Sequence, residues 1–131
     1  YLSNVTSLAG TFPAATSFSG DLSRWDVSNV TSLHCTFYRA ASFNGDISRW
    51  DVSNVTLMQS TFSGASSFNG DLSRWNVSKV TTMSSMFSGA TSFDQQLGDA
   101  WARSTARKEY MFERSSGSIA GKTNDAFGTP A

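Results

Sequence analysis

A twelve-residue segment of this chain occurs three times at constant spacing. It is GDLSRWDVSNVT at 20–31, GDISRWDVSNVT at 45–56 and GDLSRWNVSKVT at 70–81. No residue is inserted or lost between the copies. Internal repeats of this length are typical of proteins that stack one structural unit many times. The sequence therefore predicts a stack of similar coils within one domain of 131 residues.

Eight apolar positions recur in every copy and define the expected core. In the second copy they are Leu22, Trp25, Val27, Val30, Leu33, Phe37, Ala40 and Phe43. The most regular columns are Phe12, Phe37, Phe62 and Phe87, then Phe18, Phe43, Phe68 and Phe93. One copy cannot bury such a face alone, so each coil is expected to cover its neighbour.

The spacing of apolar residues predicts the local structure of one coil. Trp25 and Val27 are two positions apart, which favours a short strand. Val30, Leu33 and Phe37 follow at helical spacing, and Asn44 opens a tight turn. The predicted class is thus an α/β repeat, with one short strand and one short helix in each 25-residue coil.

The repeat also sets the expected boundaries along the chain. Residues 1–97 form the repeat solenoid, with about four copies of which the first is truncated. Residues 98–114 read as a degenerate, helix-rich C-terminal cap, because they hold seven of the twenty charged residues. Residues 115–131 are small and polar and are expected to form a tail. The chain reads as a piece of a longer protein.

The unit SFNGDISRWDVSNVT, followed downstream by Met-Phe as at 86–87, resembles the bacterial-surface-protein repeat in both its letters and its length. That family includes the BspA-like leucine-rich-repeat proteins and the DUF285 lipoproteins. The resemblance implies a leucine-rich-repeat-like, right-handed solenoid. It also implies an extracellular or cell-surface location and a role in adhesion or protein binding. It implies no catalytic residues.

The composition excludes several kinds of partner. Ten basic and ten acidic residues give a net charge of zero, so a basic footprint for nucleic acid is absent. No apolar run approaches the length of a transmembrane helix, so direct membrane insertion is not expected. The single cysteine, Cys35, cannot form a disulfide within the chain.

His34 and Cys35 are the one nucleophile–base pair that the sequence offers. Adjacent residues seldom face each other for proton transfer, and no third, orienting group is evident. Their columns hold unlike residues elsewhere: Ala9, Gln59 and Ser84 for His34, and Gly10, Ser60 and Ser85 for Cys35. Both positions are therefore interpreted as outward and permissive. We predict no enzymatic activity and no cofactor.

Two columns of carboxylates leave two interpretations open. They are Asp21, Asp46 and Asp71, and Asp26 and Asp51. Such a cluster could bind calcium, or each carboxylate could cap backbone amides in a turn; the turn role is favoured and no metal site is predicted. Asn4, Asn29, Asn54 and Asn76 match the N-glycosylation motif but also suit capping.

Positions that vary between copies are free for recognition, and they form the candidate binding site. His34, Tyr38, Arg39 and Gln59 belong to this variable set. Tyrosine and arginine are enriched among residues that dominate binding energy. The expected function is a non-catalytic module that binds a protein or a surface. The alternatives are a structural accessory subunit of a larger assembly, and an ice-binding solenoid with a hydroxyl-rich face.

Overall fold

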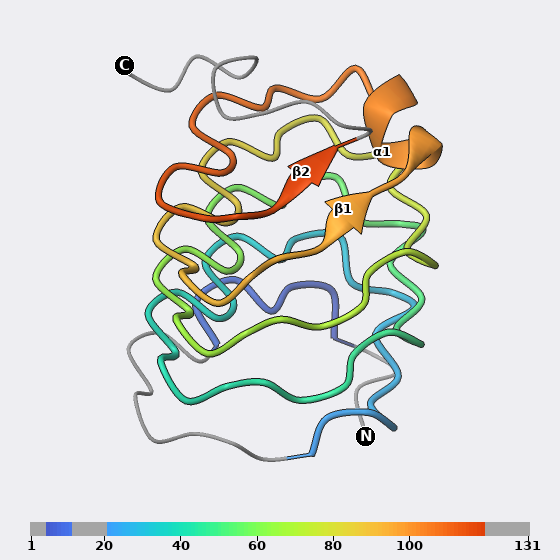
Figure 1. Ribbon diagram of the computed structural model, residues 1–131. Helices are drawn as coiled ribbons and strands as arrows, with labels where there is room; N and C mark the ends of the chain where they lie inside the picture. Colours follow the sequence, from blue (N-terminus) through green and yellow to red (C-terminus); the bar gives the residue numbers. More distant parts are fainter. Residues whose placement is uncertain (1–4, 12–20, 120–131) are drawn as a thin grey trace.

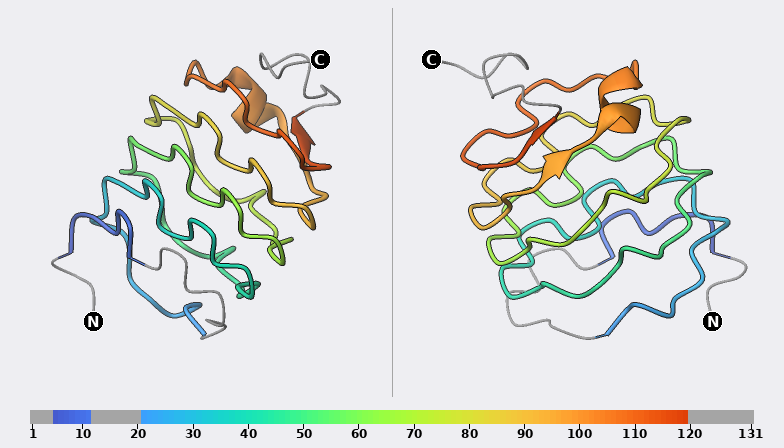
Figure 2. Two further views of the ribbon diagram at one scale, coloured as in Figure 1. Left: turned by 90° about the vertical axis from the view of Figure 1, so that its left-hand side faces the viewer. Right: turned by 45° about the vertical axis from the view of Figure 1, so that its right-hand side comes forward.

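Successive copies of the repeat lie on top of one another in the computed structural model of this chain (Figure 1). The structure describes residues 5–11 and 21–119. One line of parallel β-bridges joins each coil to the next: Ser7–Ser32, Ser32–Leu57, Leu57–Thr82 and Thr82–Arg107. Every bridge joins equivalent positions of adjacent copies, so the sequence repeat is also the spatial repeat of the coils (Figure 2).

A ladder of backbone hydrogen bonds runs alongside these bridges and holds neighbouring coils together. Leu33 donates its N–H to the carbonyl of Leu57 at 2.8 Å, and Phe37 donates to Thr61 at 2.9 Å. The same positions one coil later repeat the pattern, with Phe62 donating to Met86 at 2.8 Å. Regular parallel pairing of this kind satisfies the backbone of each coil through the next coil.

The strand and helix predicted within each coil are not formed. Around Trp25 and Val27 the chain turns at 23–24 and at 28–29, the second turn closed by Val30 N–H to the Val27 carbonyl at 2.9 Å; Ser32 makes an isolated β-bridge and residues 34–39 are turns. An α-helix needs each N–H for a carbonyl four residues earlier. Here the N–H groups at Leu33 and Phe37 are donated to the next coil instead. The leucine-rich-repeat-like class and the right-handed sense of the coil remain predictions.

The predicted core positions are confirmed for the described copies. From Leu22 to Phe43, seven of the eight predicted positions are buried, and Trp25 is partly buried against the core. Phe37, Phe62 and Phe87 form one continuous stack, with ring centroids 5.5 Å apart at each step. The equivalent Phe12 and Phe18 lie outside the described residues.

Buried polar groups in this core are satisfied by the neighbouring coil. Trp50 and Trp75 donate their indole N–H to the carbonyls of Leu22 and Ile47 at 2.9 and 3.0 Å. The buried Thr61 hydroxyl lies 3.0 Å from the Leu33 carbonyl. A buried donor without a partner is costly, so these bonds also fix the register between coils.

Two columns of turn residues have a left-handed backbone. The first contains Gly10, Cys35, Ser60, Ser85 and Tyr110, with φ between 56° and 66°. The second contains Arg39, Gly64, Gly89 and Arg114, with φ between 59° and 74°. Each of these residues is the third of four in a turn closed by a backbone hydrogen bond. For Arg39 the turn is 37–40, closed by the Ala40 N–H donating to the Phe37 carbonyl at 3.0 Å. That place in a type II turn requires positive φ and favours glycine.

The regular elements lie at the C-terminal end of the stack (Figure 1). Strand β1 (Gln96–Leu97) pairs in parallel with β2 (Ser118–Ile119), and helix α1 (Asp99–Arg103) follows β1. The predicted helix-rich cap at 98–114 therefore contains one short helix, and the remainder is mostly turn. No helix among the described residues has the length and apolar character needed to cross a membrane.

The predicted tail begins later than the sequence indicated. Ile119 is buried, and Gly117 packs so closely that an added Cβ would lie 2.5 Å from the Phe93 ring. Residues 115–119 thus belong to the fold, because β2 lies in this segment and pairs with β1. The rest of the expected tail, 120–131, lies outside the described residues.

Lys108 replaces an apolar residue of the core columns in the last coil. It occupies the position of Leu33, Met58 and Met83. Its Nζ donates to the carbonyls of Ser104 and Ala106 at 2.6 and 3.2 Å. The aliphatic stem can still cover the coil beneath while the ammonium satisfies backbone carbonyls at the end of the stack.

Replacing Ser60 by glycine should stabilise the protein. Ser60 has φ of 58°, and glycine avoids a left-handed cost of roughly 1–2 kcal/mol. We expect a gain of about 1 kcal/mol in the free energy of unfolding in urea. Ser63→Gly is the matched control, because Ser63 lacks a positive φ and should lose stability. A Ser60→Gly variant less stable than the parent would contradict the turn assignment.

Gly64→Ala should cost more stability than Gly89→Ala, although both glycines have a left-handed backbone. A Cβ on Gly64 would lie 3.1 Å from Arg39 Cγ, whereas the nearest atom to one on Gly89 is 3.6 Å away. We expect about 1 kcal/mol of loss from backbone strain in both variants and a further loss in Gly64→Ala. Urea unfolding of the two variants tests this order. Equal losses of unfolding free energy would show that Arg39 moves aside from an added Cβ at Gly64 without cost.

Candidate functional site

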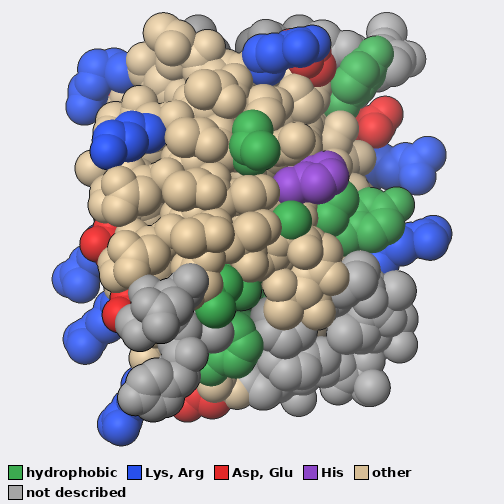
Figure 3. Space-filling model, turned by 180° about the vertical axis from the view of Figure 1, so that it is seen from behind, with side chains coloured by type: hydrophobic (Ala, Val, Ile, Leu, Met, Phe, Trp, Pro, Cys, Tyr) green, Lys and Arg blue, Asp and Glu red, His purple; other side chains and the backbone are tan. Residues whose placement is uncertain are grey.

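Over its first four coils the line of β-bridges carries uncharged outward side chains, and in the last coil it ends at the ion pair Arg107–Glu109. We call the uncharged part the bridge face and define it by eight outward residues: Ser7, Ala9, Ser32, His34, Leu57, Gln59, Thr82 and Ser84. Figure 3 looks at the side of the molecule that carries His34. In this view lysine and arginine side chains stand mostly at the margins, while uncharged groups fill the middle.

Inward and outward residues alternate along this face. Leu33 is fully buried between Ser32 and His34, as expected for a pleated segment with period two. The His34 backbone N–H lies 3.3 Å from the Ser32 hydroxyl, which fixes the two outward residues relative to each other. The ladder thus positions the outward side chains of each coil at one fixed register.

The structure brings two of the four predicted binding residues, His34 and Gln59, into contact. His34 Nδ1 lies 3.1 Å from the backbone carbonyl of Gln59. A carbonyl only accepts, so Nδ1 is the protonated ring nitrogen and Nε2 is left as an acceptor. The side-chain oxygen of Gln59 is buried without a hydrogen-bond partner among the described residues.

The His34–Cys35 geometry differs from the expectation that the two would not face each other. Cys35 Sγ lies 3.6 Å from both ring nitrogens of His34. The Gln59 carbonyl orients the ring, which is the third group that the sequence did not reveal. Burial raises the pKa of the Cys35 thiol, however, so its thiolate fraction at neutral pH is smaller than usual. The absence of enzymatic activity remains a prediction.

Tyr38 and Arg39 form the second pair of predicted binding residues. Both are exposed, and the Arg39 guanidinium lies 5.8 Å from the centre of the Tyr38 ring. Among the described residues no hydrogen bond or ring contact joins this pair to His34 or Gln59. The four residues therefore form two pairs: Tyr38–Arg39 lies in the same coil as His34, and His34–Gln59 joins that coil to the next.

Part of the variation used to select Arg39 has a backbone cause. Its column contains Gly64 and Gly89, and all three have positive φ. The glycines were a signal of a special turn rather than of freedom for recognition. A residue that the sequence reasoning missed is Tyr110, which is 40% exposed and stands in the Cys35 column.

The carboxylate columns cap turns. Asp51 Oδ1 accepts from the Ser53 backbone N–H at 3.0 Å and from its hydroxyl at 2.6 Å. Asp26 repeats both bonds with Ser28. The Ser53 hydroxyl, and next its N–H, hold the pKa of Asp51 below its ordinary value. No cluster of three metal-ligating side chains occurs in the described part of the chain.

The asparagines of the glycosylation motifs are exposed where the structure describes them. Asn54 donates its side-chain N–H to the Ser28 carbonyl at 2.9 Å, which makes it one rung between coils. Asn29 and Asn76 are also exposed, and Asn4 lies outside the described residues.

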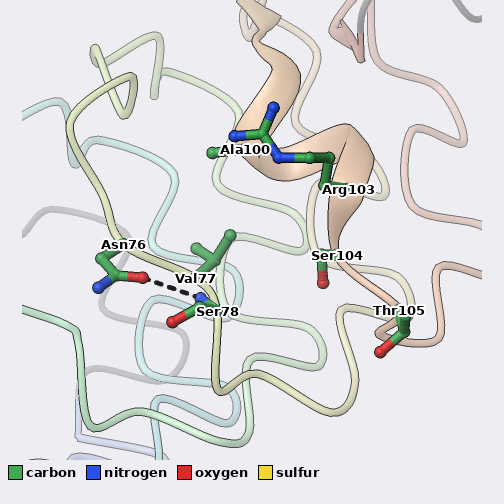
Figure 4. A pocket seen from close by; sticks show the side chains of 7 residues that line it. All are labelled: Asn76, Val77, Ser78, Ala100, Arg103, Ser104 and Thr105. Carbon is green, nitrogen blue, oxygen red and sulfur yellow. Dashed lines mark hydrogen bonds between the residues drawn. The ribbon is translucent and has the colours of Figure 1, made fainter.

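A pocket of about 420 Å³ lies between the third repeat copy and α1 (Figure 4). Its lining residues are Asn76, Val77, Ser78, Ala100, Arg103, Ser104 and Thr105. The sequence reasoning did not select any of them as a site. The pocket depends on α1, which departs from the repeat and whose position could not be read from the repeated columns.

Comparison with known proteins identifies one family. The model described as "Mycoplasma protein of unknown function, DUF285" matches residues 3–124. No curated protein and no solved structure matches the chain.

Acid should destabilise the protein through its capping aspartates. A carboxyl whose folded-state pKa is lowered contributes stability above its unfolded pKa and loses it as pH falls through the folded value. For Asp51, with its lowered pKa, the loss begins below about pH 4. In Asp51→Asn the amide can keep the cap, as Asn76 does with Ser78 N–H at 3.0 Å.

We therefore expect Asp51→Asn to reduce the slope of unfolding free energy against pH over roughly the range from 4 to 2. Asn76→Asp is the reverse variant and should increase the slope. Urea unfolding at several pH values measures both. Identical slopes for all three proteins would mean that the caps do not couple to folding.

Proposed function

This chain belongs to the DUF285 family, and we propose that it is a non-catalytic binding module of a surface or secreted protein. It recognises a protein or a surface through the bridge face and the adjacent Tyr38–Arg39 pair. The outward side chains make the contacts, and the stacked coils keep them in position.

One observation supports this proposal most strongly: the coils divide into a constant inside and a variable outside. Equivalent inward residues such as Leu33, Met58 and Met83 are fully buried and chemically alike. The outward residues next to them change from coil to coil: Ala9, His34, Gln59 and Ser84. A rigid scaffold with a varied surface suits recognition, because little side-chain and loop entropy is lost on binding.

Tyr38 and Arg39 are the residues expected to contribute most to affinity. A tyrosine presents a large ring at low entropic cost, and an arginine offers several donors in a fixed plane. The ring and guanidinium already lie together, 5.8 Å apart, before a partner arrives. His34 would add a polar contact, because it is exposed and its Nε2 is an acceptor when Nδ1 donates to the Gln59 carbonyl.

Ice binding is a second candidate, favoured by a column of threonines beside the bridge face. Thr31, Thr56 and Thr81 each donate the hydroxyl to the threonine carbonyl one coil earlier, at 3.1, 3.3 and 3.0 Å. These bonds fix the three side chains in one orientation. Thermal hysteresis of the purified chain would support this candidate over recognition of a protein.

Tyr38→Ala combined with Arg39→Ala should weaken partner binding at least about tenfold, because such residues often contribute roughly 2 kcal/mol or more. The partner is recovered from the source organism by affinity capture and then titrated in purified form. Alanine at 39 keeps the Cβ and the backbone strain, so stability should change little.

Arg49→Ala is the control, since Arg49 is also exposed but lies outside both pairs. If the parent protein binds the partner saturably and the double variant binds it with the same affinity, Tyr38 and Arg39 are not part of the binding site. Recovery only as a fixed-stoichiometry complex that resists dissociation would favour a structural accessory subunit instead.

A further inference from the structure

The pocket between 76–78 and α1 lies where one repeat copy differs in charge from the others. Asn76 stands where the earlier copies have Asp26 and Asp51. Lys79 stands where they have Asn29 and Asn54. Each replacement makes the local charge more positive by one. Both occur in the copy that lies against α1 and contributes residues to the pocket.

The change from aspartate to asparagine also frees a hydrogen-bond donor, the hydroxyl of Ser78, which is one of the residues that line the pocket. Ser28 and Ser53 donate their hydroxyls to the preceding aspartate at 2.6 Å. Ser78 donates its backbone N–H to Asn76 Oδ1, and its hydroxyl has no partner in the described residues. Figure 4 shows Asn76 Oδ1 turned toward Ser78 and the Asn76 NH₂ pointing away from α1, so the Ser78 hydroxyl is the donor that the change leaves free.

Helix α1 supplies the positive charge of the pocket. Arg103 lies in the last turn of α1 and lines the pocket, without an ion pair among the described residues. Ser104 and Thr105 follow it in the chain and also line the pocket, and none of the seven lining residues is acidic. Val77 and Ala100 add apolar surface. The lining therefore combines a guanidinium with hydroxyls, which together favour a negatively charged, hydroxylated ligand.

We propose that this pocket binds an acidic sugar, with Arg103 as the charged donor to its carboxylate and the Ser78 hydroxyl as a neutral donor to the rest of the ring. A planar carboxylate matches the fork of an arginine, which can bind both oxygens at once. The volume of about 420 Å³ lies within the range of small-molecule sites and exceeds what an inorganic ion needs. The hydroxyls and the apolar wall fit the two faces of a sugar ring. This site is independent of the bridge face.

The test is a titration of the full chain with glucuronate, followed by amide and side-chain NMR shifts at constant ionic strength. Glucose serves as the neutral counterpart of the same size, and inorganic sulfate as the anion without a ring. We expect saturable shifts confined to residues 76–78 and 99–105 with glucuronate, and much weaker effects with glucose and sulfate.

Two variants connect the binding to the named groups. Arg103→Gln removes the charge, and Asn76→Asp restores the carboxylate of the other copies and recaptures the Ser78 hydroxyl. Each should weaken glucuronate binding at least about tenfold, while Arg74→Gln, outside the pocket, should not. Asn76→Asp recreates the cap seen at Asp51, so it should fold normally.

Several results would overturn the proposal. If glucose caused the same NMR shift changes as glucuronate, the carboxylate would not be what the pocket recognises. If sulfate bound as tightly as glucuronate, the sugar ring would contribute nothing to binding. Unchanged affinity in both variants, or shifts spread over the whole surface, would show that the pocket is not the site.

Discussion

The hydrogen bonds between coils are the constraint on which the rest of this structure depends. Four alternate residues each donate the backbone N–H to a carbonyl of the next coil: Leu33, Cys35, Phe37 and Arg39. These donors are therefore not free for a helix within the coil, and the chain turns instead. Because alternate residues face outward, the same ladder that buries Leu33 also turns Ser32 and His34 toward the surface. The buried core, the turns and the outward face are therefore all determined by the hydrogen bonds that each coil donates to the next.

Each coil contains a sharp turn, and the backbone strain of that turn is concentrated in one residue with positive φ. Cys35, Ser60, Ser85 and Tyr110 have the left-handed backbone that glycine adopts most easily, as Gly10 does. A constant shape thus does not require a constant residue type at these positions. In the two left-handed columns, variation therefore reflects a backbone demand met in different ways, whereas the His34 column varies without a positive φ.

The C-terminal coil shows how the repeat ends and how a new feature arises there. Lys108 caps two carbonyls where earlier coils have Leu33 and Met83 in the core. Helix α1 replaces one turn and places Trp101 in the core, although its indole N–H has no partner in the described part of the chain. The indoles of the two preceding copies donate to the coil before them. This departure from the repeat opens the pocket beside Asn76.

The sequence by itself determined the period, the register and the inward residues, because buried apolar side chains recur at fixed spacing. Phe37, Phe62 and Phe87 could be assigned to one column from the amino-acid sequence alone, and their rings do stack. It also indicated the capping role of Asp51, since that depends on a neighbour two positions away. Only the tertiary structure decided that the segment predicted to be helical makes a β-bridge at Ser32 and turns at residues 34–39. It alone placed the Cys35 thiol against His34 and formed the pocket at α1. In each of these cases the deciding contact or hydrogen bond comes from the three-dimensional arrangement, and no local spacing encodes it.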